Sequence, residues 1–324
     1  MNDPLTITAD VEPVENRFSS SDSTAIFYRR WTCPAPRAAL HLVHGMAEHS
    51  LRYDRLARRL AGRGIEVWAA DMRGHGKTAD RAVNDPGTGG QLGHAADTGA
   101  ENLIMNDLSA MNRMIRGAVP RKPLFMLGHS WGSFLTQLYI EEHGNDIDGC
   151  ILSGTRGPGG FKVAAGGVVL ALIALCAGAR RPVELSRALS DGPFNRPFRP
   201  NRTSFDWLSR DEAEVDAYIA DPVSGMLASA GFYRDLIALL RRIHLKENIA
   251  AIRKNLPVYV YAGSEDPVGD MGAGPAALIE AYRQAGLTDL ELTLYPGARH
   301  EMHNETNREE MTGNLVAWLE KHIA

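Results

Sequence analysis

Residues 124–132 read LFMLGHSWG, an apolar run followed directly by a Gly-x-Ser-x-Gly pattern centred on Ser130. The apolar run predicts a short buried strand, and the residues that follow the pattern predict a helix. A serine on such a sharp strand-to-helix turn exposes its Oγ to substrate. Glycines two positions before and after it are needed because the turn brings neighbouring backbone too close for a Cβ. The stretch therefore predicts a nucleophile at Ser130.

Similar apolar runs recur on both sides of this stretch and alternate with amphipathic stretches. They predict further strands at residues 38–43, 65–70, 150–152, 258–261 and 290–294. The amphipathic stretches predict helices near 53–62, 100–115, 134–142, 276–285 and 308–322. Apolar strands that alternate with helices are typical of an α/β fold with a mostly parallel, doubly wound sheet. The segments near 16–19 and 25–31 predict an antiparallel hairpin at one edge of this sheet.

The alternation breaks between residues 156 and 246, apart from a helical stretch around 210–219. We therefore predict a core of residues 1–155 plus 247–324 and a helical cap, or lid, inserted at 156–246. The first part of the cap, residues 156–210, holds nine Lys or Arg against three acids. Two interpretations follow: a solvated cap surface, or a basic and apolar lid that contacts anionic lipid headgroups or a phosphate-bearing substrate.

Composition excludes several classes of protein. The 324 residues carry a net charge of −4, which argues against general nucleic-acid binding. The three cysteines, at 33, 150 and 176, are too few and too far apart for a disulfide framework. The first ten residues, MNDPLTITAD, do not resemble a signal peptide, so we expect a cytoplasmic protein. Residues 163–179 are uncharged but short and glycine-rich for a membrane span, which favours a buried helix or one that touches a lipid surface.

A serine hydroxyl needs a base to take its proton and an acid to orient that base. In this architecture the chain order is serine, acid, histidine. His300 follows the last predicted strand in LELTLYPGARH and is the candidate base, with His303 as the weaker alternative. The strand VYVY runs into a loop that contains Asp266, the candidate acid, with Glu265 and Asp270 as alternatives. The order therefore predicts a complete Ser-Asp-His triad.

Acyl transfer also needs N–H donors aimed at the developing oxyanion. We expect one from the backbone of Trp131, directly after the nucleophile, and one from Met46 in the loop HGMAEHS. His44 is expected to brace that loop. His41, His44 and His49 gather in sequence, but the first two straddle a strand and face opposite sides, and no matching carboxylate or cysteine set follows. We expect no metal there.

The segments HGMAEHSLRYDRLARRL, ADMRGHGKT, GHSWGS, GSEDPVGD and YPGARHEMHNE together resemble the α/β-hydrolase superfamily. More narrowly, they resemble its bacterial lysophospholipase and monoacylglycerol lipase-like serine hydrolases, over about residues 38–319. The resemblance implies a mobile cap over an acyl-chain pocket, with no metal and no organic cofactor. By motif position it implies these roles: nucleophile Ser130, acid Asp266, base His300, oxyanion donors Met46 and Trp131. Many members carry Met where this chain has Trp131, which bears on the shape of the acyl pocket.

The motifs and the resemblance predict a serine hydrolase that cleaves esters of single-acyl lipids through an acyl-enzyme. Lysophospholipids and monoacylglycerols fit equally well, and the basic cap slightly favours a phosphate-bearing headgroup. Transient contact of the cap with a membrane, and hence peripheral association, is part of this hypothesis. The alternatives are a proline iminopeptidase-like amide hydrolase, a small-ester esterase and a non-catalytic binding protein. The iminopeptidase alternative has GHSWGS in its favour, but HGMAEH stands where those enzymes carry an HGGPG-type loop.

Overall fold

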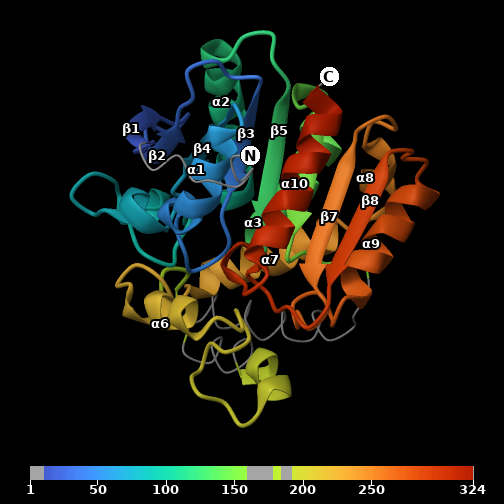
Figure 1. The fold of residues 1–324 in the computed structure, drawn as a ribbon. Coiled ribbons are helices and arrows are strands. Elements are labelled where there is room, and N and C mark those ends of the chain that lie inside the picture. Colours follow the sequence, from blue (N-terminus) through green and yellow to red (C-terminus); the bar gives the residue numbers. More distant parts are fainter. Residues whose placement is uncertain (1–10, 159–177, 184–191, 324) are drawn as a thin grey trace.

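The computed structural model describes residues 11–158, 178–183 and 192–323 (Figure 1). Within them, one eight-stranded sheet has the order β1-β2-β4-β3-β5-β6-β7-β8. The first two strands and the β2–β4 pair are antiparallel, and the remaining neighbours are parallel. The strands are β1 (Val14–Ser19), β2 (Ala25–Trp31), β3 (Ala38–Val43), β4 (Ile65–Ala70), β5 (Leu124–His129), β6 (Gly149–Ser153), β7 (Val258–Gly263) and β8 (Leu290–Tyr295).

The α/β fold and the edge hairpin predicted from the sequence are confirmed. Every residue of β3, β4, β5, β6 and β7 is buried, which explains why these strands read as continuous apolar runs. The strand β5 continues two residues past its apolar run, to His129, because Gly128 and His129 still pair with β6. The Gly-x-Ser-x-Gly pattern therefore begins within the sheet itself, at the carboxyl end of β5.

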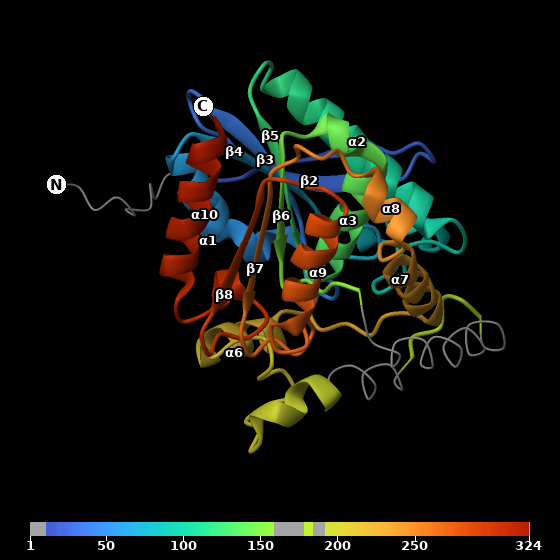
Figure 2. The ribbon, with the colours of Figure 1, turned by 90° about the vertical axis from the view of Figure 1, so that its right-hand side faces the viewer.

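Helices cover both faces of the sheet (Figure 2). On one face lie α1 (Asp54–Gly62) and α10 (Arg308–Ile323), and on the other lie α2 (Ala100–Ala118), α3 (Trp131–His143), α8 (Lys246–Ala251) and α9 (Ala273–Gln284). Each face has its own hydrophobic core. The α3 helix begins three residues earlier than predicted, because the turn is complete at Ser130 and leaves Trp131 free to start the helix.

The described residues of the predicted cap include the helices α6 (Glu212–Ala220) and α7 (Ala230–Arg242). The helical stretch expected around 210–219 corresponds to α6, whereas α7 was not predicted. Asp211 caps α6 through the Ala213 N–H, and Ser229 caps α7 through the Phe232 N–H. Figure 1 shows α6 below the sheet, at the ends of the strands where the arrowheads lie. The cap boundaries at 156 and 246 stay a prediction.

Most of the uncharged run at 163–179 lies outside the described residues, since only positions 178 and 179 are described. In the part of the chain that the structure describes, no helix is both long and apolar enough to cross a membrane.

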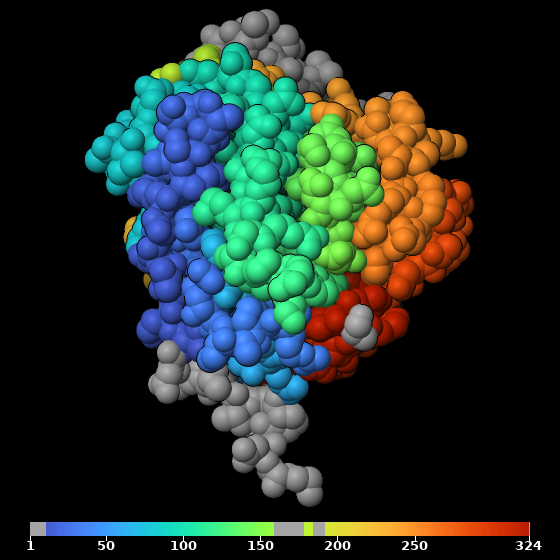
Figure 3. Space-filling view, turned by 90° about the horizontal axis from the view of Figure 1, so that it is seen from above, coloured from blue at the N-terminus to red at the C-terminus, as the bar shows by residue number. Residues whose placement is uncertain are grey.

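The face away from α6, seen in Figure 3, runs from the first strands in blue through α2 in blue-green to α9 in orange and α10 in red.

The turn between β5 and α3 is strained and tightly packed. Ser130 has a left-handed φ of 53° with ψ of −121°, which a non-glycine residue rarely adopts. A Cβ on Gly128 would lie 2.3 Å from the Gly132 carbonyl oxygen. A Cβ on Gly132 would lie 2.2 Å from the carbonyl oxygen of Val43 at the end of β3. Both glycines are therefore required by close backbone contacts, as the sequence pattern predicts.

The contact at Gly128 predicts a large cost for an added methyl group. Gly128→Ala should destabilise the fold by about 3 kcal/mol, because the obstacle is backbone that cannot move aside. Gly313→Ala is the control, since its Cβ meets nothing within 4 Å and α10 should gain up to about 1 kcal/mol. Urea unfolding of the three proteins measures both changes. Equal midpoints for the two variants would contradict the packing account.

Candidate active site

The loops that follow four strands of the parallel part of the sheet converge at the carboxyl ends of these strands. They are the loop after β3 with Met46, the turn after β5 with Ser130, the loop after β7 with Asp266 and the loop after β8 with His300. Ser130 and His300 line the same cavity, of about 180 Å³, and Asp266 is fully buried. Residues up to 254 positions apart in the chain thus meet at one place, as their order in the sequence predicts.

Asp266 orients His300. The Nδ1 of His300 lies 3.0 Å from both carboxylate oxygens of Asp266, and the Val268 N–H donates to one of these oxygens at 2.9 Å. Burial, the largest single influence, lowers the pKa of His300, but the Asp266 carboxylate, together with Glu301 and Glu48, outweighs it and holds that pKa above its usual value. The imidazole therefore keeps its proton on Nδ1, toward Asp266, and can present its other nitrogen to the cavity.

The alternative triad members lie elsewhere. Glu265 and Asp270 are exposed, and the carboxylate that His300 meets is that of Asp266. His303 stacks on the Tyr53 ring at 4.2 Å between centroids. Burial lowers the pKa of His303 well below its usual value, which suits a neutral packing group. The geometry thus favours the pair His300 and Asp266 over the alternatives.

The loop after β3 is braced from the core by His44, as expected from the sequence. The Met72 N–H donates to Nε2 of His44 at 2.9 Å, so the ring proton must be on Nδ1, which donates to the Gly45 carbonyl at 2.7 Å. Burial lowers the pKa of His44 to about 4, which keeps this tautomer neutral. The Gly45 carbonyl and the Met46 N–H belong to one peptide group, so His44 sets the direction of that N–H.

The second predicted donor, the N–H of Trp131, is at the first position of α3, where no intrahelical acceptor exists. The Trp131 indole packs between the core and α7. It stacks on His75 at 5.1 Å and meets Phe232 of α7 at 4.9 Å, measured between ring centroids. The indole therefore lies where the core meets α7 of the predicted cap.

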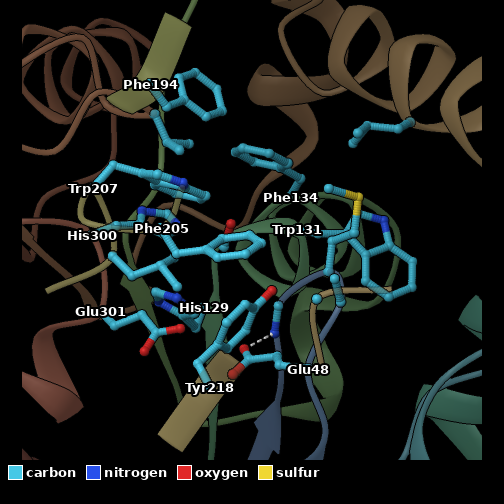
Figure 4. Close-up of a pocket in the computed structure, with 18 of the residues that line it drawn as sticks. Glu48, His129, Trp131, Phe134, Phe194, Phe205, Trp207, Tyr218, His300 and Glu301 are labelled. Carbon is cyan, nitrogen blue, oxygen red and sulfur yellow. Dashed lines mark hydrogen bonds between the residues drawn. The ribbon is translucent and has the colours of Figure 1, made fainter. Parts of the chain in front are cut away.

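The cavity has an apolar end and a polar end (Figure 4). Phe134 and Phe194 lie toward one end in that view, and Glu48, Tyr218 and Glu301 lie toward the other. The lining is mainly aromatic or aliphatic, and α3, α7 and the segment before α6 contribute these large side chains to it: Trp131, Phe134, Phe194, Phe205, Trp207, Leu208, Tyr233, Leu236 and Leu240. Such a cavity accommodates an acyl chain at one end and a small polar group at the other.

A buried charge cluster forms the polar end, and sequence reasoning missed it. Arg52 lies between two carboxylates, with its Nε 3.4 Å from Glu48 and an ion pair to Glu301. One oxygen of Glu48 accepts from the Gly45 N–H at 2.5 Å and from the Tyr53 hydroxyl at 2.6 Å. Its other oxygen has no hydrogen-bond partner among the described residues. The available signal was proximity: Glu48 is two residues from Met46, and Glu301 directly follows His300.

Burial raises the pKa of Glu48 to about 7; the nearby Arg52 opposes this shift and Glu301 adds to it. The cluster therefore changes its charge near neutral pH.

The three histidines that lie close together in the sequence, at 41, 44 and 49, each have a separate partner. His41 meets Asn112, His44 meets the Gly45 carbonyl, and His49 meets Asp221. Among the residues that the structure describes, no group of three His, Cys, Asp or Glu side chains is placed to hold a metal ion.

Comparison with known proteins identifies the family. The model of the family described as serine aminopeptidase, S33, matches residues 34–307. The chain belongs to this family. Its fold is the α/β-hydrolase fold, and it is a carboxylic-ester hydrolase.

Relatives of this S33-family chain cover nearly its whole length. A monoacylglycerol lipase of Mycolicibacterium smegmatis is 28% identical over 95% of this chain and 98% of its own. The monoglyceride lipase of Homo sapiens is 27% identical over 88% of this chain and 83% of its own. The structure is also similar to a carboxyl esterase from Bacillus coagulans, solved in complex with glycerol, at a TM-score of 0.86 with 27% identity over 96% and 99% of the two chains.

The contact between His300 and Asp266 predicts the titration of this S33-family hydrolase. In the wild type, the imidazole of His300 should titrate above 6.5, because the carboxylate stabilises the protonated form. In Asp266→Asn the pKa should fall, because burial then opposes only the smaller effects of Glu301 and Glu48. NMR of the histidine Cε1–H resonances measures both values, with His300→Gln to assign the signal. An unchanged pKa in Asp266→Asn would show that the two side chains are apart in solution.

Proposed function

We propose that this enzyme hydrolyses monoacylglycerols, with Ser130 as nucleophile, His300 as general base and Asp266 as the orienting acid. One observation carries the proposal. Ser130 and His300 open into a cavity that is apolar at one end and carries a small polar cluster at the other. An ester of one fatty acid and a small alcohol likewise has a long apolar part and a small polar part. The scissile carbonyl would lie where the two halves meet, beside Ser130.

The acylation step follows from these positions. The Ser130 Oγ attacks the ester carbonyl carbon while His300 takes the hydroxyl proton, and Asp266 stabilises the resulting imidazolium through Nδ1. The negative oxygen of the tetrahedral intermediate accepts from the N–H groups of Met46 and Trp131. The intermediate then breaks its bond to the alcohol oxygen, and His300 returns the proton to the leaving alcohol. The acyl group stays on Ser130.

Deacylation repeats these steps with water as the nucleophile. His300 takes a proton from water, the hydroxide forms a bond to the acyl carbon, and the Ser130 oxygen leaves with the proton from the imidazolium. The net reaction consumes one water and releases a fatty acid and an alcohol. The contact between His300 and Asp266 is already formed without substrate, so that part of the proposed site needs little rearrangement.

The polar end of the cavity favours an uncharged headgroup. Glu48 and Glu301 place two carboxylates there against the single cation of Arg52, so a phosphate would meet net negative charge. A glycerol hydroxyl can instead donate to the Glu48 oxygen that accepts no hydrogen bond from the described residues. We therefore favour glycerol esters over the phosphate-bearing headgroup that the charge of the cap suggested. The names of the relatives, monoacylglycerol lipase and monoglyceride lipase, support the same choice.

Replacement of the nucleophile tests the mechanism. Ser130→Ala should lower fatty-acid release from monooleoylglycerol by at least about 10⁴-fold, because no other group can form the acyl-enzyme. Ser19→Ala, an exposed serine at the end of β1, is the control and should keep wild-type activity. A proline arylamide assayed alongside tests the iminopeptidase alternative. Release of the arylamine with no release of oleate would show that the enzyme hydrolyses amides and not lipid esters.

Comparison of headgroups tests the role of the polar cluster. At pH 8, the wild type should prefer monooleoylglycerol over oleoyl-lysophosphatidate by at least about tenfold in kcat/KM, because Glu48 and Glu301 repel the phosphate. Glu48→Gln should reduce that preference severalfold, since it removes one charge and keeps the shape. Glu310→Gln, an exposed residue of α10, is the matched control. A wild-type preference for lysophosphatidate would show that basic groups dominate the headgroup site.

A further inference from the structure

A turn of the predicted cap lies directly on the loop that holds Met46. The turn, residues 221–225, follows α6 and is shaped by the Asp221 carboxylate. One oxygen of that carboxylate accepts from the Val223 N–H at 3.0 Å, and the other accepts from the Ser224 hydroxyl at 2.8 Å. These are local bonds of the kind with which aspartate stabilises turns. The same side chain thus fixes the turn from within.

The turn contacts the loop after β3 twice. The second oxygen of Asp221 accepts from Nε2 of His49 at 2.6 Å. The N–H of Gly225, at the other end of the turn, donates to the Ala47 carbonyl at 2.8 Å. Both loop residues are buried, so neither contact competes fully with water. Five residues of the predicted cap, 221–225, therefore span the loop from Ala47 to His49.

The loop is strained at the point that the turn holds. Ala47 has a φ of 60°, a left-handed conformation that costs an alanine about 1 kcal/mol or more. Such a conformation persists only where its surroundings impose it. Ala47 directly follows Met46, whose peptide is held on its other side by His44 and Gly45. The core thus fixes one side of Met46, and the cap turn fixes the other.

We propose that Asp221 is a positioning residue for the oxyanion site: it holds His49 and the cap turn so that Ala47 stays left-handed and the Met46 N–H points into the cavity. The inference rests on the proposed function, which assigns that N–H to the oxyanion. It adds a requirement that the triad alone does not contain. The oxyanion site is complete only when the turn at 221–225 is seated on the loop.

A merely structural role predicts a different pattern of effects. The helix α6, which precedes the turn, also contacts α1 through an ion pair between Glu214 and Arg55. That pair joins the cap to the core without touching the loop of Met46. If the cap only needs to be anchored, loss of the Glu214 contact and loss of the Asp221 contact should have equal effects. If Asp221 positions the loop, only its loss should weaken stabilisation of the oxyanion.

The test compares Asp221→Ala, His49→Gln and Glu214→Gln on monooleoylglycerol and with an alkyl trifluoromethyl ketone, which forms a tetrahedral oxyanion on a serine. Asp221→Ala should lower kcat by roughly tenfold with KM within about twofold, a partial loss of one oxyanion donor. Its affinity for the ketone should fall by a similar factor. His49→Gln should stay within about threefold of wild type, because its amide can donate to Asp221. Glu214→Gln should match the wild type.

Equal losses in Asp221→Ala and Glu214→Gln, or a rise in KM with kcat unchanged, would overturn the inference. If Asp221→Ala does not fold, His49→Ala carries the test, since it removes the contact and leaves the turn intact; it should show the loss that His49→Gln avoids. The ketone also separates this inference from the proposed function. A wild type that binds the ketone but does not cleave monooleoylglycerol would contradict the substrate only, and the ketone affinities of the variants would still decide the role of Asp221.

Discussion

The close approach of α3 to the end of β3 is the constraint on which the site depends. A single backbone contact, between Gly132 and the carbonyls of Val43 and His44, brings the turn of Ser130 against the start of the Met46 loop. The distance from the nucleophile to both proposed oxyanion donors is therefore set by backbone, which is stiffer than side chains. This explains why a strained φ at Ser130 is tolerated: the sheet and the helix hold the residue from both sides.

The fold could be predicted from the sequence because its strands are buried on both faces. Such strands must be apolar throughout, so LFML and VYVY are visible without any alternation to interpret. The prediction failed where local signals were weak. The amphipathic stretch predicts a helix from Phe134, whereas α3 begins at Trp131; Gly132 and Ser133 are weak helix formers, so the first turn of α3 has little local signal. The α7 helix was missed for a different reason: its segment is amphipathic and has a serine N-cap, but it lies in the span 156–246 that was assigned to the cap without finer division.

The triad candidates could be predicted from the sequence and the charge cluster could not, and this difference has a physical cause. The residues brought together as Ser130, Asp266 and His300 each follow a strand at a position that local sequence marks. The cluster of Glu48, Arg52 and Glu301 depends instead on two loops 250 residues apart that meet in space. No local pattern carries that information. The contact of the cap turn with the oxyanion loop is non-local in the same sense, because it joins residues 172 positions apart.

Several basic residues of the predicted cap, which in the sequence suggest a surface for anionic lipids, form ion pairs in the structure. Arg180 pairs with Asp97 and Arg210 with Glu305, so two of the basic residues that suggested a lipid-binding surface are matched by acids of the core. Arg202 pairs within the cap, with Asp216. Pairs of this kind hold a cap to a negatively charged core, and they reduce the charge available to anionic lipids. A lipid surface would have to compete with the core for the same arginines. The charge that an anionic surface would meet on the described part of the cap is therefore smaller than the count of its basic residues suggests, because these arginines already face acids of the core or of the cap itself.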